Sequence, residues 1–171
     1  MNTMSVNEQN WILRNKMVLS LAAIGVLAGA WWAFRPEKLF INQKVSEPAP
    51  FSTSGEPQPI YTGELQGKAH ATSGRATVYR AQDGKLFLRL SDFSTSNGPD
   101  VHVLLLKTTA ELDKELLFGD PDKVEVGSLK GNQGDQNYNL PPNADLNQYQ
   151  TVAIYCERFH VVFANSRLEK F

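Results

Sequence analysis

The side chains best suited to redox chemistry or metal binding lie in one stretch, Thr151–Phe163, which reads TVAIYCERFHVVF. It contains the only cysteine, Cys156, and His160, one of three histidines. A reactive thiolate needs positive charge nearby. Arg158 and His160 are the candidates to lower the pKa of the Cys156 thiol, or to bind a metal or haem together with it. If the strand continues, Arg158 and His160 lie on the same strand face as Cys156. If Glu157-Arg158 forms a turn instead, their side chains point in other directions. The alternative is that Cys156 is a small core residue, because Val152 and Ile154 share its face.

The few cysteine, histidine and methionine residues limit which metal or redox sites the chain can form. A single cysteine excludes an intramolecular disulfide, a paired-cysteine redox motif and a cysteine-rich zinc site within one chain. Cys156, His160, His102 and His70 are the cofactor-binding candidates, and haem or copper is the cofactor class they suit. No methionine follows Met17, so the usual copper site with an axial thioether is excluded. Each histidine alone also fits a structural role.

Other catalytic motifs are absent from the sequence. There is no GxSxG elbow, HExxH helix, P-loop or GxGxxG loop. Several oxygen donors in predicted loops could hold a calcium ion, but turn chemistry explains them more simply. They are Asp92, Asn97, Asp100, Asn132 and Asp135.

The segments that must position these residues look like short strands. Leu86, Leu88 and Leu90 alternate with polar or outward residues, and Asp83-Gly84 before them is a hairpin-turn signal. Thr108–Phe118 has helical spacing and predicts one or two helical turns. The sequence therefore predicts an all-β domain over residues 60–171, a β-sandwich or a jelly-roll-like barrel. Predicted strands cover 76–79, 86–91, 100–106, 124–129, 137–140, 150–156 and 159–163.

The N-terminal region predicts a membrane segment. Residues Met17–Phe34 carry no charge, and 18 helical residues span roughly 27 Å, close to a bilayer's hydrocarbon thickness. Trp31 and Trp32 lie at one edge, where aromatic anchors are common. We expect a transmembrane helix or signal-anchor over residues 17–34 after a tail over 1–16. The simplest topology is a single-pass membrane protein with its C-terminal domain outside the cytoplasm.

Between the membrane segment and the domain lies a linker over residues 35–59. Gln43–Pro59 is rich in proline, serine and threonine, which predicts an extended spacer. The net charge of −1 gives no electrostatic footprint for nucleic acid, so no nucleic-acid partner is expected. The membrane and a redox partner protein are the expected partners.

From about Tyr61 to Leu168, several ordered motifs resemble the DM-thirteen domain family, which is described as an electron-transfer domain. The matching pieces are Gly63-Glu64-Leu65, His70, Ser73-Gly74-Arg75-Ala76, Leu88-Arg89-Leu90, Asp92-Phe93, Asn97-Gly98-Pro99-Asp100-Val101-His102-Val103, Leu129-Lys130-Gly131-Asn132, Gly134, Gln136, Tyr138, Leu140-Pro141, Val152-Ala153-Ile154-Tyr155-Cys156, Phe159, Val161, Phe163, Ala164 and Leu168. The resemblance implies a β-sandwich with one hallmark cysteine, here Cys156, acting as a bare thiol or by binding a group such as haem. One anchor and one domain is a layout that looks bacterial.

Two hypotheses about function follow. In the first, the membrane-anchored domain handles electrons or oxidants through Cys156, as a redox thiol or as a ligand of haem or a metal. In the second, a non-catalytic β-sandwich binds a surface ligand or a partner protein through loops Ser94–Asp100 and Gly131–Tyr138. Whether the protein is an enzyme is left open by the sequence.

Overall fold

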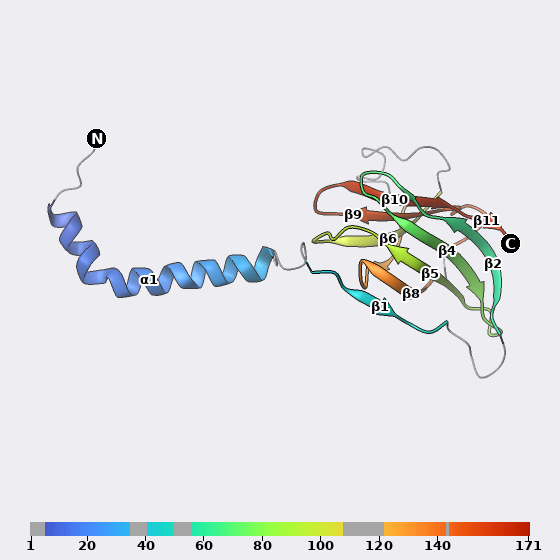
Figure 1. Cartoon of the computed structure of the whole chain (residues 1–171), viewed down its shortest axis with the longest axis horizontal. Helices are drawn as coiled ribbons and strands as arrows, with labels where there is room; N and C mark the ends of the chain where they lie inside the picture. Colours follow the sequence, from blue (N-terminus) through green and yellow to red (C-terminus); the bar gives the residue numbers. More distant parts are fainter. Residues whose placement is uncertain (1–5, 35–40, 50–55, 108–121, 143) are drawn as a thin grey trace. The chain divides into compact units, whose positions relative to one another are not determined.

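The computed structural model describes residues 6–34, 41–49, 56–107, 122–142 and 144–171 (Figure 1). Two units can be distinguished, Met1–Glu37 and Lys38–Phe171, and each is treated separately. The segment Thr108–Phe118, for which the sequence predicts helical turns, lies outside the described residues.

The first unit contains the helix α1, Val6–Phe34. Leucine, alanine and other good helix formers fill it, and proline first occurs just after it, at Pro36. Its stretch Asn15–Trp32 is long and apolar enough to cross a membrane, judged by length and composition, and a signal sequence has the same properties. Apolar side chains such as Val26 and Trp32 are exposed along it. The predicted segment 17–34 is therefore an apolar helix.

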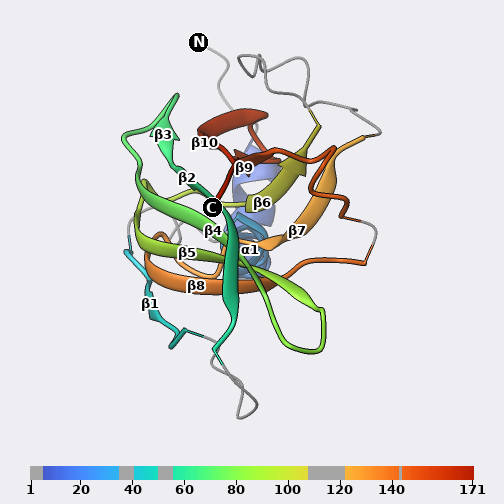
Figure 2. The same cartoon turned by 90° about the vertical axis from the view of Figure 1, so that its right-hand side faces the viewer.

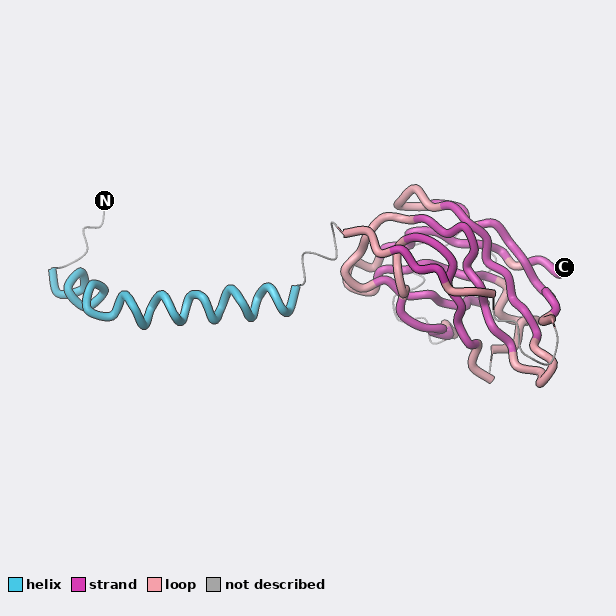
Figure 3. Tube along the Cα trace, turned by 60° about the horizontal axis from the view of Figure 1, so that its bottom comes forward, coloured by secondary structure: helices cyan, strands magenta, loops and turns pink. Residues whose placement is uncertain are grey.

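The second unit is built from two β-sheets (Figures 2 and 3). In spatial order, the six-stranded sheet contains β1 (Lys44–Ser46), β8 (Gln133–Asn139), β5 (Leu86–Ser94), β4 (Ser73–Arg80), β2 (Gln58–Glu64) and β11 (Glu169–Lys170). The five-stranded sheet contains β3 (Gln66–Gly67), β10 (Val161–Arg167), β9 (Thr151–Cys156), β6 (Val101–Leu106) and β7 (Val124–Ser128). The β-sandwich expected from the sequence is confirmed.

The hydrophobic core lies between the two sheets. Leu88 and Leu90 of β5 contribute fully buried side chains from one sheet, and Val103 and Ile154 contribute them from the other. Each such side chain stabilises the fold by about 1.5–3 kcal/mol relative to exposure. The period-two pattern of the sequence thus marks the sides of the strands that face each other.

The hairpin between β4 and β5 follows from its turn residues. Gly84 has a φ of 83°, a left-handed conformation that glycine adopts without steric cost. The Asp83 carboxylate accepts a hydrogen bond from the Lys85 backbone N–H at 3.0 Å, which fixes the turn. The antiparallel register that results pairs Tyr79 with Phe87.

Part of the predicted linker belongs to the sandwich. Lys44–Ser46 forms β1, which pairs in parallel with β8 along the edge of the six-stranded sheet. Glu47 then bonds the Lys130 ammonium at 2.7 Å and the Asn137 N–H at 2.7 Å. Composition could not predict this strand, because its stability comes from the exposed edge of β8 and from Lys130, distant in sequence. The expectation that residues 35–59 form only a linker is therefore wrong at Lys44–Ser46, which is a strand of the sandwich.

A buried amide holds the β7–β8 connection in place. The Gln136 side chain is fully buried, and its Oε1 accepts hydrogen bonds from the Tyr138 hydroxyl at 2.8 Å and the Lys130 N–H at 3.1 Å. Its Nε2 donates to the Gly131 carbonyl at 2.7 Å. One side chain therefore satisfies several polar groups that have left water.

We predict that Gln136→Leu destabilises the domain by on the order of 3 kcal/mol, because the Tyr138 hydroxyl loses its buried acceptor and the Gly131 carbonyl loses its donor. Chemical unfolding of the purified full chain measures this loss. Gln148→Leu is the matched control, since Gln148 is exposed and its side chain bonds Asp145 in its own loop. Equal stability of the two variants would contradict the role given to Gln136.

Candidate functional site

Cys156 is the last residue of β9, at one end of the five-stranded sheet. Its neighbours across the sheet are Val101 on β6 and Val161 on β10. It is fully buried and belongs to the core between the sheets together with Val152 and Ile154. No hydrogen bond to its sulfur occurs among the described residues. The thiol therefore faces inward, as the core interpretation of the sequence predicts.

The loop before β6 packs on this end of the core. A Cβ placed on Gly98 would lie 2.5 Å from Val101 Cγ2 and 3.0 Å from Phe163 Cζ, so only glycine allows the backbone to lie so close. Asp100 accepts a hydrogen bond from the Glu157 N–H at 2.9 Å, which ties the loop to the residue after Cys156. The segment Ser94–Asp100 thus closes the core next to the thiol.

His160 is the last residue of a four-residue turn that follows Cys156. Residues 157–160 join β9 to β10, so the strand does not continue and the turn considered from the sequence is present. Arg158 and His160 are exposed there. His160 Nδ1 lies 3.1 Å from the Tyr155 hydroxyl, whose side chain is on the opposite face of β9 from Cys156. The structure therefore joins His160 to Tyr155 and not to the inward-facing thiol.

The backbone at His160 is unusual. Its φ is 52°, in the left-handed region that costs a residue other than glycine about 1–2 kcal/mol. A glycine would adopt this conformation at no such cost. The position therefore keeps an imidazole where the backbone alone favours glycine, which points to a use for the side chain.

His102 lies on the outer face of the five-stranded sheet, directly across from Tyr155. Its Nδ1 is 2.7 Å from Glu125 Oε1, and its Nε2 is 2.9 Å from Asp100 Oδ1. Burial disfavours the charged ring, but the hydrogen bonds and charges of Asp100 and Glu125 outweigh it and raise the pKa of His102. An imidazole held between two carboxylates is a structural link from β6 to β7 and to the loop before β6.

His70 lies in the loop between β3 and β4, where its ring packs on Phe163 with centroids 4.0 Å apart. Phe163 belongs to the same core cluster as Cys156. His70 is thus at the end of the sandwich that holds the thiol, in contact with an aromatic ring.

The expected haem or copper site does not fit this arrangement. Cys156 faces the core, His102 uses both ring nitrogens for carboxylates, and His160 faces Tyr155. Across the described ranges, no three His, Cys, Asp or Glu side chains are grouped to hold a metal ion. The four candidate ligands do not converge, and no step is derived through a bound group.

The oxygen donors considered for calcium have structural partners instead. Asp135 pairs with Arg89 at 2.5 Å and accepts the Asp92 N–H at 2.9 Å. Asn132 is buried and bonds the Gln43 N–H at 2.7 Å and the Thr95 carbonyl at 3.1 Å. The remaining two are also engaged, Asn97 with Asn42 and Asp100 with His102. Turn and loop stabilisation therefore accounts for this set.

Tyr155 is the residue that the sequence analysis missed. It is fully buried in a second apolar cluster on the outer face, formed with Leu104, Leu106, Ala153 and Val162. The Lys123 ammonium lies 5.7 Å from the ring centroid. The sequence contained a signal for it. Strand alternation places Tyr155 on the opposite face from Cys156, and a buried phenol hydroxyl there needs a hydrogen-bond partner.

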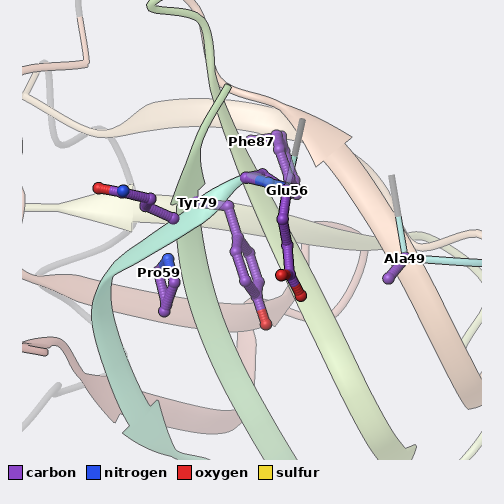
Figure 4. A pocket seen from close by; sticks show the side chains of 7 residues that line it. Ala49, Glu56, Pro59, Tyr79 and Phe87 are labelled. Atoms are coloured by element: carbon purple, nitrogen blue, oxygen red, sulfur yellow. The ribbon is translucent and has the colours of Figure 1, made fainter. Parts of the chain in front are cut away.

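A separate cavity of about 430 Å³ lies against the six-stranded sheet (Figure 4). Tyr79 and Phe87 stack there with centroids 5.2 Å apart and ring planes 9° apart. Glu56 and Pro59 also line it. This site shares no residue with the end of β9.

Comparison with known proteins bears on the whole domain. Residues 64–168 match the family model described as electron transfer DM13. The chain belongs to the electron transfer DM13 family. No curated protein and no solved structure matched it significantly.

The resemblance seen in the sequence is thereby confirmed at the level of the family. The DM13 region begins at the end of β2 and extends to Leu168, so it includes Cys156, Tyr155 and His160. An electron-transfer-related role follows from this membership.

The His102 clamp predicts a pH dependence of stability. Because its pKa is raised in the folded state, its contribution is fully present below pH 6.5 and is lost as pH rises through the folded pKa. We expect the stability advantage of the native chain over Glu125→Gln to be largest near pH 6 and to shrink toward alkaline pH. Urea unfolding across this range measures it.

Glu169→Gln is the matched control, since Glu169 is exposed on the short strand β11. Its difference from the native chain should not follow the titration of His102. An advantage over Glu125→Gln that grows with pH would contradict the clamp.

Proposed function

We propose that this protein is a membrane-anchored electron-transfer domain located outside the cytoplasm, with its redox centre at the end of β9. The observation that carries the proposal is the DM13 match, which spans residues 64–168 and includes Cys156, the only cysteine. Cys156 is the proposed redox thiol, and Arg158 and His160 lie in the adjacent turn.

The helix α1 supports the anchor. Asn15–Trp32 has the length and apolar composition of a membrane span. Arg14 and Lys16 come just before the charge-free stretch, and a short N-terminal tail inside is the simplest orientation. An uncleaved helix of this kind would keep the domain close to a membrane redox partner.

The burial of Cys156 constrains how the thiol works. Thiol–disulfide exchange requires a partner's sulfur to approach in line, and a fully buried side chain prevents this. Covalent chemistry at Cys156 therefore requires movement of the Ser94–Asp100 loop or of the turn at 157–160. Electron transfer without bond formation needs no such opening.

The turn itself offers a contact for a redox partner protein. Phe159 is 61% exposed at its tip, so its ring is accessible to a partner protein. Arg158 beside it adds an exposed positive charge. A partner that contacts these two residues comes within one turn of both Cys156 and Tyr155.

A binding role is the second candidate, and the cavity at Tyr79 and Phe87 is the observation that favours it. Stacked aromatic rings beside a carboxylate suit a flat polar ligand. The segment Gly131–Tyr138, one of the two first considered for binding, is less suited, because Asn132 and Gln136 within it are buried and bond the protein itself.

The purified full chain in detergent tests the redox proposal. We expect hydrogen peroxide to oxidise the Cys156 thiol of the folded protein to a sulfenic acid, with water as the second product. Dithiothreitol, itself oxidised to a disulfide, should restore the thiol. Thiol titration and mass measure both steps, and Cys156→Ser should abolish them. A visible spectrum and metal analysis of the same sample test ligation of haem or copper.

Tyr79→Ala is the control, since it alters the distant cavity and should leave oxidation unchanged. An unreactive thiol in the folded chain, with neither chromophore nor metal, would refute the proposal that Cys156 is the centre and would favour the binding role.

A further inference from the structure

Tyr155 and His160 form a pair whose geometry is not explained by packing alone. The phenol ring is fully buried, yet its hydroxyl reaches His160 Nδ1 at 3.1 Å, at the exposed turn. We propose that Tyr155 is a redox residue of this domain, oxidised by one electron while its proton moves to His160. This inference rests on the proposed electron-transfer function and names a second redox group at the same site.

The environment of Tyr155 favours coupled movement of electron and proton. Burial, followed by the charges of Glu157 and Cys156, raises the pKa of the phenol, so it does not ionise alone at neutral pH. Loss of an electron without the proton would leave a cationic ring in an apolar cluster. A positioned base removes both difficulties.

His160 is placed to be that base. When neutral with its proton on Nε2, its Nδ1 accepts the hydrogen bond of the phenol. The ring is exposed, so the positive charge of the imidazolium that forms is solvated by water. The left-handed φ of 52° shows that an imidazole is held where glycine would fit more easily.

The reaction balances with a one-electron oxidant of the ferric or cupric class, supplied by the redox partner. The oxidant gains one electron and becomes ferrous or cuprous. The O–H bond of Tyr155 breaks, its proton forms a bond to His160 Nδ1, and a neutral phenoxyl radical and an imidazolium remain. Reduction by one electron returns the proton and restores the phenol.

Charged groups on every neighbouring described element fit the product state. Lys123, before β7, lies over the ring and pairs with Glu157 at 3.0 Å, so its charge is compensated. His102 on β6 is compensated by Asp100 and Glu125. The Glu157 carboxylate is in the same turn as the imidazolium that forms.

The test uses the full chain in detergent, oxidised by a photogenerated ruthenium(III) complex and followed by electron paramagnetic resonance and transient absorption. We expect a phenoxyl radical that Tyr155→Phe abolishes and that forms more slowly in deuterium oxide. Tyr149→Phe is the matched control, since Tyr149 lies in the segment before β9, outside both candidate sites, and this variant should leave the signal unchanged.

His160→Gly removes the base while suiting the left-handed backbone, so this variant should remain folded. We expect radical formation to slow at least about tenfold, because a positioned base contributes ~10² or more to proton transfer. Added imidazole should restore part of the rate. An unchanged rate in His160→Gly, or an unchanged radical in Tyr155→Phe, would overturn the inference.

These results separate the inference from the proposed function. If Cys156→Ser abolishes reversible oxidation but Tyr155→Phe leaves the radical unchanged, the electron-transfer role is kept and the role of Tyr155 is rejected. If the radical depends on Tyr155 and His160 while Cys156 is inert, the centre moves from the thiol to the tyrosine.

Discussion

Strand β9 is buried on both faces, and this constraint organises the domain. All six of its residues, Thr151–Cys156, are buried between β6 and β10. Because side chains alternate along a strand, Cys156 must face the core between the sheets while Tyr155 must face the outer cluster. The two oxidisable side chains at this end of the domain are therefore adjacent in sequence but have separate surroundings.

Polar contacts fix the segments that surround this end. Asp100 binds the Glu157 N–H and the His102 ring, so the loop before β6, the turn after β9 and the outer sheet face are held together. At the other sheet, the buried amides of Asn132 and Gln136 hold the loop between β7 and β8. The proposed redox reaction at the end of β9 would therefore take place in a preorganised environment, which reduces the rearrangement that accompanies a change of charge.

The sequence predicted much of the fold because β-strand alternation and turn signals are local. Leu86, Leu88 and Leu90 marked β5, and Asp83-Gly84 marked its hairpin. Strand β1 could not be predicted, since Lys44–Ser46 is stable only against β8, nearly ninety residues further on. The family was recognised from motifs that span most of the domain, and the match over residues 64–168 confirms it.

The candidate site was predicted less completely. The sequence singled out the segment with Cys156 and His160 near the end of a strand, but it left open whether they share a face. The turn at 157–160 and the positive φ of His160 decide this, and both depend on the geometry that connects β9 to β10. Tyr155 was overlooked because an aromatic residue in an apolar strand is usually core, and only its hydroxyl contact distinguishes it.

The most direct test of the central claim is a redox titration of the full chain in lipid nanodiscs, counting electrons given up to an added oxidant and regained from a reductant per protein. The account predicts that the native chain gives up and regains electrons reversibly, and that the double variant Cys156→Ser, Tyr155→Phe loses this capacity. Equal electron release by the native chain and the double variant would show that the end of β9 is not the redox centre.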